Sequence, residues 1–156
     1  MSVKANRKRE KVLAVASSGG HWVQLRRVTP AFAESEVVYV TVLDSYRAEV
    51  PENKFYSVKD ATRWNKFGLL VLATQLAWIL MKEKPDVVIS TGAAPGYFAI
   101  LLGRLFRAKT IWIDSMANIE ELSMSGARVS RYADLWLTQW PHLARSEGPH
   151  YAGGVL

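Results

Sequence analysis

Continuous apolar runs rich in β-branched residues recur along the chain, and they constrain the fold more than any other feature of the sequence. Five such runs predict strands, at residues 12–16, 37–42, 86–91, 109–114 and 134–138. Helical patterns fall between or after them, at residues 21–33, 63–82, 96–106 and 127–132. Strands without polar alternation are typical of a sheet that is covered on both faces. The alternation therefore predicts a Rossmann-like α/β fold, with a parallel sheet and helices on both sides.

The length of 156 residues suits a single domain with a sizeable core. We expect a basic N-terminal tail over residues 1–10 and one domain over residues 11–156. The chain has no cysteine, which excludes disulfides, thiolate metal sites and catalytic thiols and fits a reducing compartment. Nothing ahead of the first predicted strand resembles a secretion signal.

The formal net charge of +6 indicates an anionic partner, which can be a phosphorylated substrate, an anionic membrane surface or nucleic acid. The basic residues do not alternate with aromatic residues, and no nucleic-acid-binding motif is present. We therefore expect no nucleic-acid partner.

A glycine loop follows the first predicted strand directly and opens the first predicted helix. Its residues are Ser17, Ser18, Gly19, Gly20 and His21. Adjacent glycines let a ligand approach the backbone, and the free amides of a helix N-terminus attract anions. This loop predicts a site for a polar or phosphorylated ligand. It does not match the Gly-x-Gly-x-x-Gly fingerprint, which disfavours a dinucleotide cofactor.

Two further loops follow predicted strands and carry polar residues or glycine. Thr91 and Gly92 lie in one of them, and Asp114, Ser115 and Asn118 lie in the other. Ligands of parallel α/β sheets bind at the carboxyl ends of the strands, where such loops gather. We expect these residues to line one crevice with the glycine loop and to bind an acceptor or its phosphate.

His21 is the first candidate for a general base, because a neutral imidazole can take a proton from an attacking hydroxyl or donate a hydrogen bond to a diphosphate. The alternative is a helix-capping or packing histidine. Asp114 is the second candidate, and its alternative role is to cap the next turn together with Ser115. No Asp-x-Asp pair or His/Asp/Glu cluster is present, so we predict no metal site.

The segment 67–81 is the most apolar part of the chain and is flanked by cations. As a helix its 15 residues reach about 22 Å, against roughly 30 Å of membrane hydrocarbon, so it is too short to span a bilayer. It is either a core helix or one whose outer face lies in a membrane surface with the cations on anionic head groups. For the second possibility the predicted membrane contacts are Trp64, Phe67, Leu70 and Trp78.

Several short motifs resemble one family in order and spacing. They are Ser-Ser-Gly-Gly-His at 17–21, Ser-Thr-Gly at 90–92, Ile-Asp-Ser-Met-Ala-Asn at 113–118, Leu-Ser-x-Ser-Gly at 122–126, Tyr-Ala-Asp-Leu at 132–135, Thr-Gln-Trp-Pro at 138–141 and Tyr-Ala-Gly-Gly at 151–154. From about residue 11 to 154 the chain is similar to the acceptor-side, membrane-anchoring subunits of two-subunit GT-B glycosyltransferases. These include the anchor subunit of the dolichyl-diphosphate N-acetylglucosamine transferase and its bacterial relatives in capsule and exopolysaccharide biosynthesis.

This resemblance implies the N-terminal, acceptor-binding half of a GT-B enzyme, with a nucleotide-sugar-binding glycosyltransferase subunit as its partner in a heterodimer. The implied reaction is inverting transfer of glucuronic acid or N-acetylglucosamine from a UDP-sugar to a polyprenyl-diphosphate-linked saccharide. No cofactor is implied, since the UDP-sugar is a substrate held mainly by the partner. His21 would then face the acceptor hydroxyl, with Asp114 as the second choice of base.

Family members with an N-terminal anchor have a long apolar segment before the first strand, whereas ten mostly polar and basic residues stand there in this sequence. We therefore expect peripheral attachment to the cytoplasmic face of the inner (plasma) membrane through residues 63–82 and the basic N-terminus. Two other functions stay open. One is a non-catalytic scaffold that recruits a catalytic partner to the membrane, and the other is a stand-alone nucleotide-binding Rossmann protein.

Overall fold

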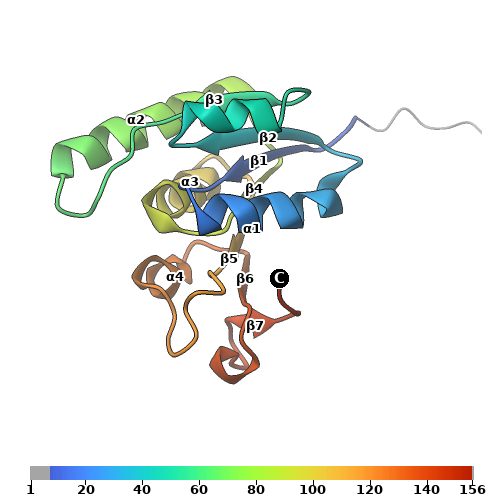
Figure 1. Ribbon diagram of the computed structural model, residues 1–156, viewed down its shortest axis with the longest axis vertical. Coiled ribbons are helices and arrows are strands. Elements are labelled where there is room, and N and C mark those ends of the chain that lie inside the picture. The colour runs from blue at the N-terminus through green and yellow to red at the C-terminus, as the bar shows by residue number, and fades with distance from the viewer. Residues whose placement is uncertain (1–7, 156) are drawn as a thin grey trace, which may run out of the picture.

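A seven-stranded parallel sheet with the order β3-β2-β1-β4-β5-β6-β7 forms the centre of the protein (Figure 1). The computed structural model describes residues 8–155, so residues 1–7 of the predicted basic tail lie outside the described part. The strands are β1 (Lys11–Val15), β2 (Glu36–Thr41), β3 (Lys54–Ser57), β4 (Val87–Ser90), β5 (Lys109–Ile113), β6 (Leu135–Thr138) and β7 (His150–Tyr151). The predicted Rossmann-like α/β class is confirmed.

Helices connect the strands much as the sequence pattern predicts. The α-helices are α1 (Gly20–Val28), α2 (Lys66–Glu83), α3 (Ala93–Leu105) and α4 (Met124–Val129), and the 3-10 helices are η1 (Thr29–Phe32), η2 (Asp44–Glu49) and η3 (Pro141–Leu143). The first predicted helix, 21–33, is divided into α1 and η1. Pro30 lacks an amide hydrogen and cannot continue the α-helical ladder, so the chain tightens into a 3-10 turn there.

Both faces of the sheet are buried, which is why the strands read as continuous apolar runs. Leu13 and Val15 of β1 belong to a core shared with α2, α3 and α4. Val12 and Ala14 point to the opposite face, into a core shared with α1 and the segments around η1 and η2. Successive side chains of a strand alternate between faces, so each central strand supplies both cores.

Two strands, β3 and β7, were not predicted from the sequence. In β3 only Phe55 is buried, because this strand lies at the edge of the sheet and has β2 as its single neighbour. β7 has two exposed residues and is defined only by its pairing with β6. Short edge strands bury little surface and leave a weak hydrophobic pattern.

A buried carboxylate fixes the end of α2 to the sheet. Glu83 accepts hydrogen bonds from Lys11 Nζ at 3.1 Å, Lys54 Nζ at 3.2 Å and Tyr56 Oη at 2.5 Å. Burial by itself raises the pKa of Glu83, but these three donors outweigh it and hold the pKa below its usual value. The anchored end sets how α2 lies along β3.

Candidate active site

The order of the strands reverses between β1 and β4. From β1 the chain proceeds to β2 and β3 on one side, and it returns to β4 on the other side before continuing to β5 and β6. In open parallel sheets ligands bind at the carboxyl ends of the strands at such a switch point. The loops that follow β1 and β4 carry the predicted residues Ser17–Gly20 and Thr91–Gly92.

The glycine loop exposes its backbone at this edge. Gly19 and Gly20 are exposed, Ser17 and Ser18 are half-buried, and Gly19 has a φ of +68°, which favours glycine. The N-cap residue of α1 is Gly19, which has no side chain to cap the helix. The free amides of its first turn therefore carry a partial positive charge toward solvent, as anion sites do.

His21 links the two loops of the switch point. The hydroxyl of Thr91 donates to the backbone oxygen of His21 at 2.6 Å. A Cβ added to Gly92, whose φ is +139°, would lie 2.6 Å from His21 Cδ2 and 2.7 Å from Nε2. The imidazole thus lies directly against the backbone where α3 begins, and the absence of a side chain at Gly92 makes room for it.

The surroundings of His21 favour the neutral imidazole. Burial lowers the pKa of His21, and the negative charge of Asp114 opposes this shift only in part. A neutral ring at pH 7 can accept a proton from a hydroxyl group. Within residues 8–155, no three His, Asp or Glu side chains lie close enough together to hold a metal ion.

Asp114 is only 1% exposed and is the hydrogen-bond acceptor that organises its own loop. It accepts from Trp112 Nε1 at 3.1 Å, from Asn118 Nδ2 at 3.2 Å and from both the amide and the hydroxyl of Ser123. These contacts occupy both carboxylate oxygens. The geometry favours the capping alternative for Asp114 over the role of base, and it commits the Asn118 amide to Asp114.

Ser115 is also held inside the protein, by a glutamine network that the sequence reasoning missed. Its hydroxyl accepts from Gln24 Nε2 at 3.0 Å, and Gln24 Oε1 accepts from Met116 N at 3.0 Å and from Gln139 Nε2 at 2.6 Å. A glutamine on the apolar side of a helix is the one sequence signal for such a network. Because Gln24 lies one turn after His21, the network sets the orientation of α1 and thus of the imidazole.

The 3-10 helix η2 covers the outer side of the glycine loop, and the sequence reasoning missed it too. Tyr46 Oη accepts from the amide of Gly19 at 3.1 Å. The Tyr46 ring stacks on Trp22 with centroids 4.9 Å apart, and Trp22 Nε1 donates to Glu49 Oε2 at 2.9 Å. One amide of the loop is therefore occupied by a tyrosine hydroxyl, which still has its own proton to donate.

The four predicted membrane contacts lie on the outside of the molecule. Trp64, Phe67, Leu70 and Trp78 are 80%, 77%, 64% and 51% exposed. The opposite side of α2 is buried, with Leu72 and Leu76 fully enclosed, so the helix has one core face and one exposed apolar face. No helix in the described part of the chain combines the length and the hydropathy needed to cross a membrane.

The fold and the switch-point site define a Rossmann-like α/β domain. The structure resembles MurG from Acinetobacter baumannii with a TM-score of 0.75, at 16% identity, over 93% of this chain and 45% of that one. It also resembles UDP-N-acetylglucosamine 2-epimerase from Rickettsia bellii with a TM-score of 0.67, at 13% identity, over 86% of this chain and 40% of that one. At these identities the likeness establishes the fold.

The chain belongs to the family described as "Oligosaccharide biosynthesis protein Alg14 like", which matches residues 56–155. It is 31% identical over 86 residues to UDP-N-acetylglucosamine transferase subunit alg14 of Schizosaccharomyces pombe, covering 52% of this chain and 34% of that protein. It is 26% identical over 168 aligned positions to the Homo sapiens subunit ALG14, covering 85% of this chain and 76% of that protein. The match thus spans about a third of the fission yeast relative. The resemblance seen in the sequence is confirmed at the level of the family.

Proposed function

We propose that this chain is the acceptor-side subunit of a glycosyltransferase that moves N-acetylglucosamine from a UDP-sugar to a polyprenyl-diphosphate-linked saccharide. One observation is the main support for this proposal. His21 is partly buried and lies where the N-termini of α1 and α3 meet at the switch point, in a chain of the Alg14-like family. The names of the relatives, UDP-N-acetylglucosamine transferase subunits, favour N-acetylglucosamine over glucuronic acid as the sugar.

The proposed chemistry is a direct displacement. The acceptor hydroxyl oxygen forms a bond to the anomeric carbon, the bond from that carbon to UDP breaks, and UDP leaves with the electron pair. The hydroxyl proton passes to the neutral imidazole of His21. The exposed amide of Gly20, the hydroxyl proton of Tyr46 and the N-terminus of α3 at Gly92 hold the acceptor diphosphate. Ser115 and Asn118 contribute indirectly, by shaping the loop after β5.

The donor is proposed to bind to a separate nucleotide-sugar-binding subunit, because the relatives are named as subunits. Peripheral attachment at the cytoplasmic face would bring a lipid-linked acceptor to the site. The exposed apolar face of α2 and the turn before it support this. Arg63 Cζ lies 4.5 Å from the centroid of the Trp64 ring in that turn, and Lys82 Nζ lies 4.7 Å from the Trp78 ring on α2. Aromatic side chains with adjacent cations suit an anionic membrane surface.

The test is transfer of labelled N-acetylglucosamine to a polyprenyl-diphosphate saccharide by the chain reconstituted with its donor-binding subunit. His21→Ala should lower turnover by roughly 10²- to 10⁴-fold, the usual contribution of a general base. His150→Ala, at an exposed position on β7, is the matched control and should keep full activity.

Two results would overturn the proposal. Full turnover and membrane binding by His21→Ala would show that the chain is a scaffold for a catalytically complete partner. Tight binding of UDP-N-acetylglucosamine by this chain alone would show a stand-alone nucleotide-binding protein. Isothermal titration calorimetry with the purified full chain measures this nucleotide-sugar binding directly.

A further inference from the structure

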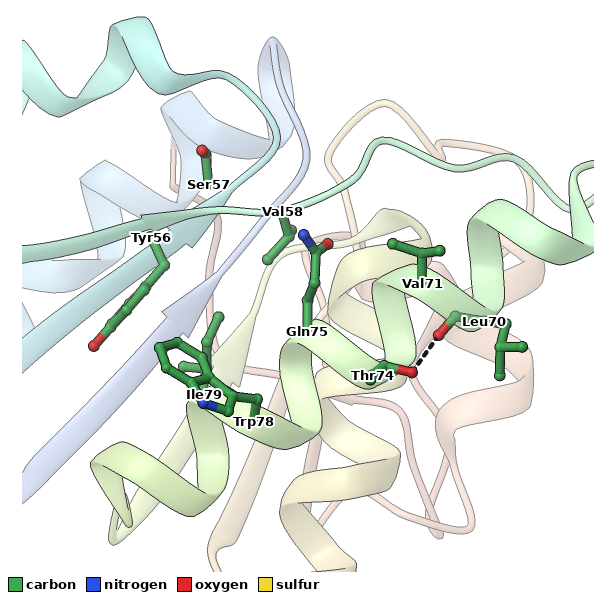
Figure 2. A pocket seen from close by; sticks show the side chains of 9 residues that line it. All are labelled: Tyr56, Ser57, Val58, Leu70, Val71, Thr74, Gln75, Trp78 and Ile79. Carbon is green, nitrogen blue, oxygen red and sulfur yellow. Dashed lines mark hydrogen bonds between the residues drawn. The ribbon is translucent and has the colours of Figure 1, made fainter.

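An apolar groove of about 520 Å³ runs between α2 and the end of β3 (Figure 2). Small-molecule sites typically have volumes of roughly 300 to 1,000 Å³, so the groove is large enough for a ligand. Its walls come from two segments, the residues at the end of β3 and one side of α2. They are Tyr56, Ser57, Val58, Leu70, Val71, Thr74, Gln75, Trp78 and Ile79. Figure 2 shows Val71 and Gln75 rising from α2 toward the segment after β3.

Three polar side chains around this groove already have partners in the protein. Gln75 Oε1 accepts from the amide of Lys59 at 2.7 Å, the Thr74 hydroxyl donates to Leu70 O at 2.8 Å, and the Tyr56 hydroxyl donates to Glu83. The groove therefore offers hydrocarbon surface to an occupant. An apolar chain fits these walls, whereas a sugar or a nucleotide would lose its hydrogen bonds to water there.

The groove and the glycine loop lie at the same edge of the sheet. The amide of Val58, in the groove wall, donates to Thr41 O at 2.8 Å, and the Thr41 hydroxyl donates to Ser17 O at 3.3 Å. These contacts join the carboxyl ends of β3, β2 and β1. Along the sheet, the carboxyl ends of β3 and β1 are two strand spacings apart, or about 10 Å.

We propose that this groove binds the first isoprenoid units of the acceptor lipid while the diphosphate of the same molecule lies at the glycine loop. This inference rests on the proposed function, which supplies the diphosphate and the loop. A polyprenyl diphosphate has a charged head joined directly to a hydrocarbon chain, and the two sites present those surfaces at the same edge of the sheet. The α2 wall from Leu70 to Ile79 rises about 14 Å, which gives the chain a defined path along the helix.

The groove overlaps the surface proposed to meet the bilayer only in part, because the two share Leu70 and Trp78. Trp64 and Phe67 lie outside its walls and are the most exposed of the large apolar side chains on this part of the molecule. Leu70 and Trp78 form its outer margin and are 64% and 51% exposed. Trp64 and Phe67 thus belong to the proposed bilayer surface alone, whereas Leu70 and Trp78 border both that surface and the groove.

The experiment is photo-crosslinking of the full chain with geranylgeranyl diphosphate that carries a diazirine on the isoprenoid, followed by mass-spectrometric mapping. Crosslinks should fall on residues 56–58 and 70–79, and excess unlabelled geranylgeranyl diphosphate should remove them. Val71→Trp, which fills the groove, should lower the yield at least tenfold. Met81→Trp places the same residue on α2 outside the groove walls and should leave the yield unchanged.

The groove assignment is overturned if crosslinks fall elsewhere or if Val71→Trp leaves the yield unchanged. It is also overturned if a diazirine-labelled acyl lipid in anionic vesicles labels residues 56–58 and Val71 as strongly as the isoprenoid does, since the groove would then be a bilayer contact. Amide NMR shifts of Gly19 and Gly20 on addition of inorganic diphosphate separate the two proposals. If these shifts are absent, the proposed function itself fails. If they are present without groove crosslinks, only the groove assignment fails.

Discussion

Replacing Asp114 with asparagine tests whether this carboxylate organises its loop or takes part in the chemistry. The new amide group must take the place of one of the two carboxylate oxygens. In one orientation it faces the Trp112 Nε1–H, and in the other it faces the backbone N–H of Ser123. Neither donor can become an acceptor, so one buried N–H loses its partner at a cost of about 1–3 kcal/mol.

The remaining hydrogen bonds also lose the help of a full negative charge, which brings the expected total to about 3 kcal/mol. A loss of this size in a domain of this length lowers the Tm by roughly 6–12 °C. Differential scanning calorimetry of the purified chain measures the change. Asp44→Asn is the matched control, because Asp44 is 69% exposed and pairs only with Arg47, so its stability should change by about 0.5 kcal/mol or less.

The reasoning fails if Asp114→Asn keeps the Tm of the unchanged protein. If, in addition, the variant loses transfer activity in the reconstituted enzyme, Asp114 takes part in the reaction and the order of the two candidate bases is wrong. If the Tm falls as expected and activity falls only with the loss of folded protein, the loop-organising role stands.

Three other predictions concern the switch point. His21 should titrate with a midpoint below 6.5 in NMR spectra of the isolated chain, because burial lowers its pKa. The unfolded chain then takes up the proton at a higher pH than the folded chain does, so the free energy of unfolding falls as the pH drops below about 6.5. This fall should be larger in the unchanged protein than in His21→Gln. Gly92→Ala should cost about 1–3 kcal/mol in denaturant unfolding and shift the His21 ring resonances. Gly20→Ala should change stability little, because its added Cβ would lie 3.9 Å from Gln24 Nε2, an ordinary van der Waals contact. Tyr46→Phe should speed hydrogen exchange at the Gly19 amide with little change in Tm, while Tyr39→Phe should lower stability by about 1 kcal/mol and leave that exchange rate unchanged.

Most of the fold follows from local patterns in the sequence. The central strands β1, β2, β4 and β5 are each apolar on both faces, and the residues between them have helical spacing. The elements that escaped prediction are the ones that bury least, such as β3, with Phe55 as its one buried residue, and the two-residue β7. Their existence depends on a neighbouring strand, which a local pattern does not contain.

The candidate site also has one part that the sequence predicts and one part that it does not. The glycine loop and His21 follow a strand directly, so their position at the carboxyl edge is a consequence of chain order. The role of Asp114 does not follow from its position after β5, because it depends on Trp112, Asn118 and Ser123 closing around it. Residue type alone leaves both roles of such a carboxylate open.

The sequence by itself determined the parallel α/β architecture, the family, and the loops that meet at the switch point, because hydrophobic spacing and glycine positions act over a few residues. Only the tertiary structure decided what those loops contact. Gln24 meets Gln139 across 115 residues of sequence, and Tyr46 reaches Gly19 across 27. Hydrogen bonds and grooves of this kind arise when distant segments pack, and neither partner carries a local signal of the other.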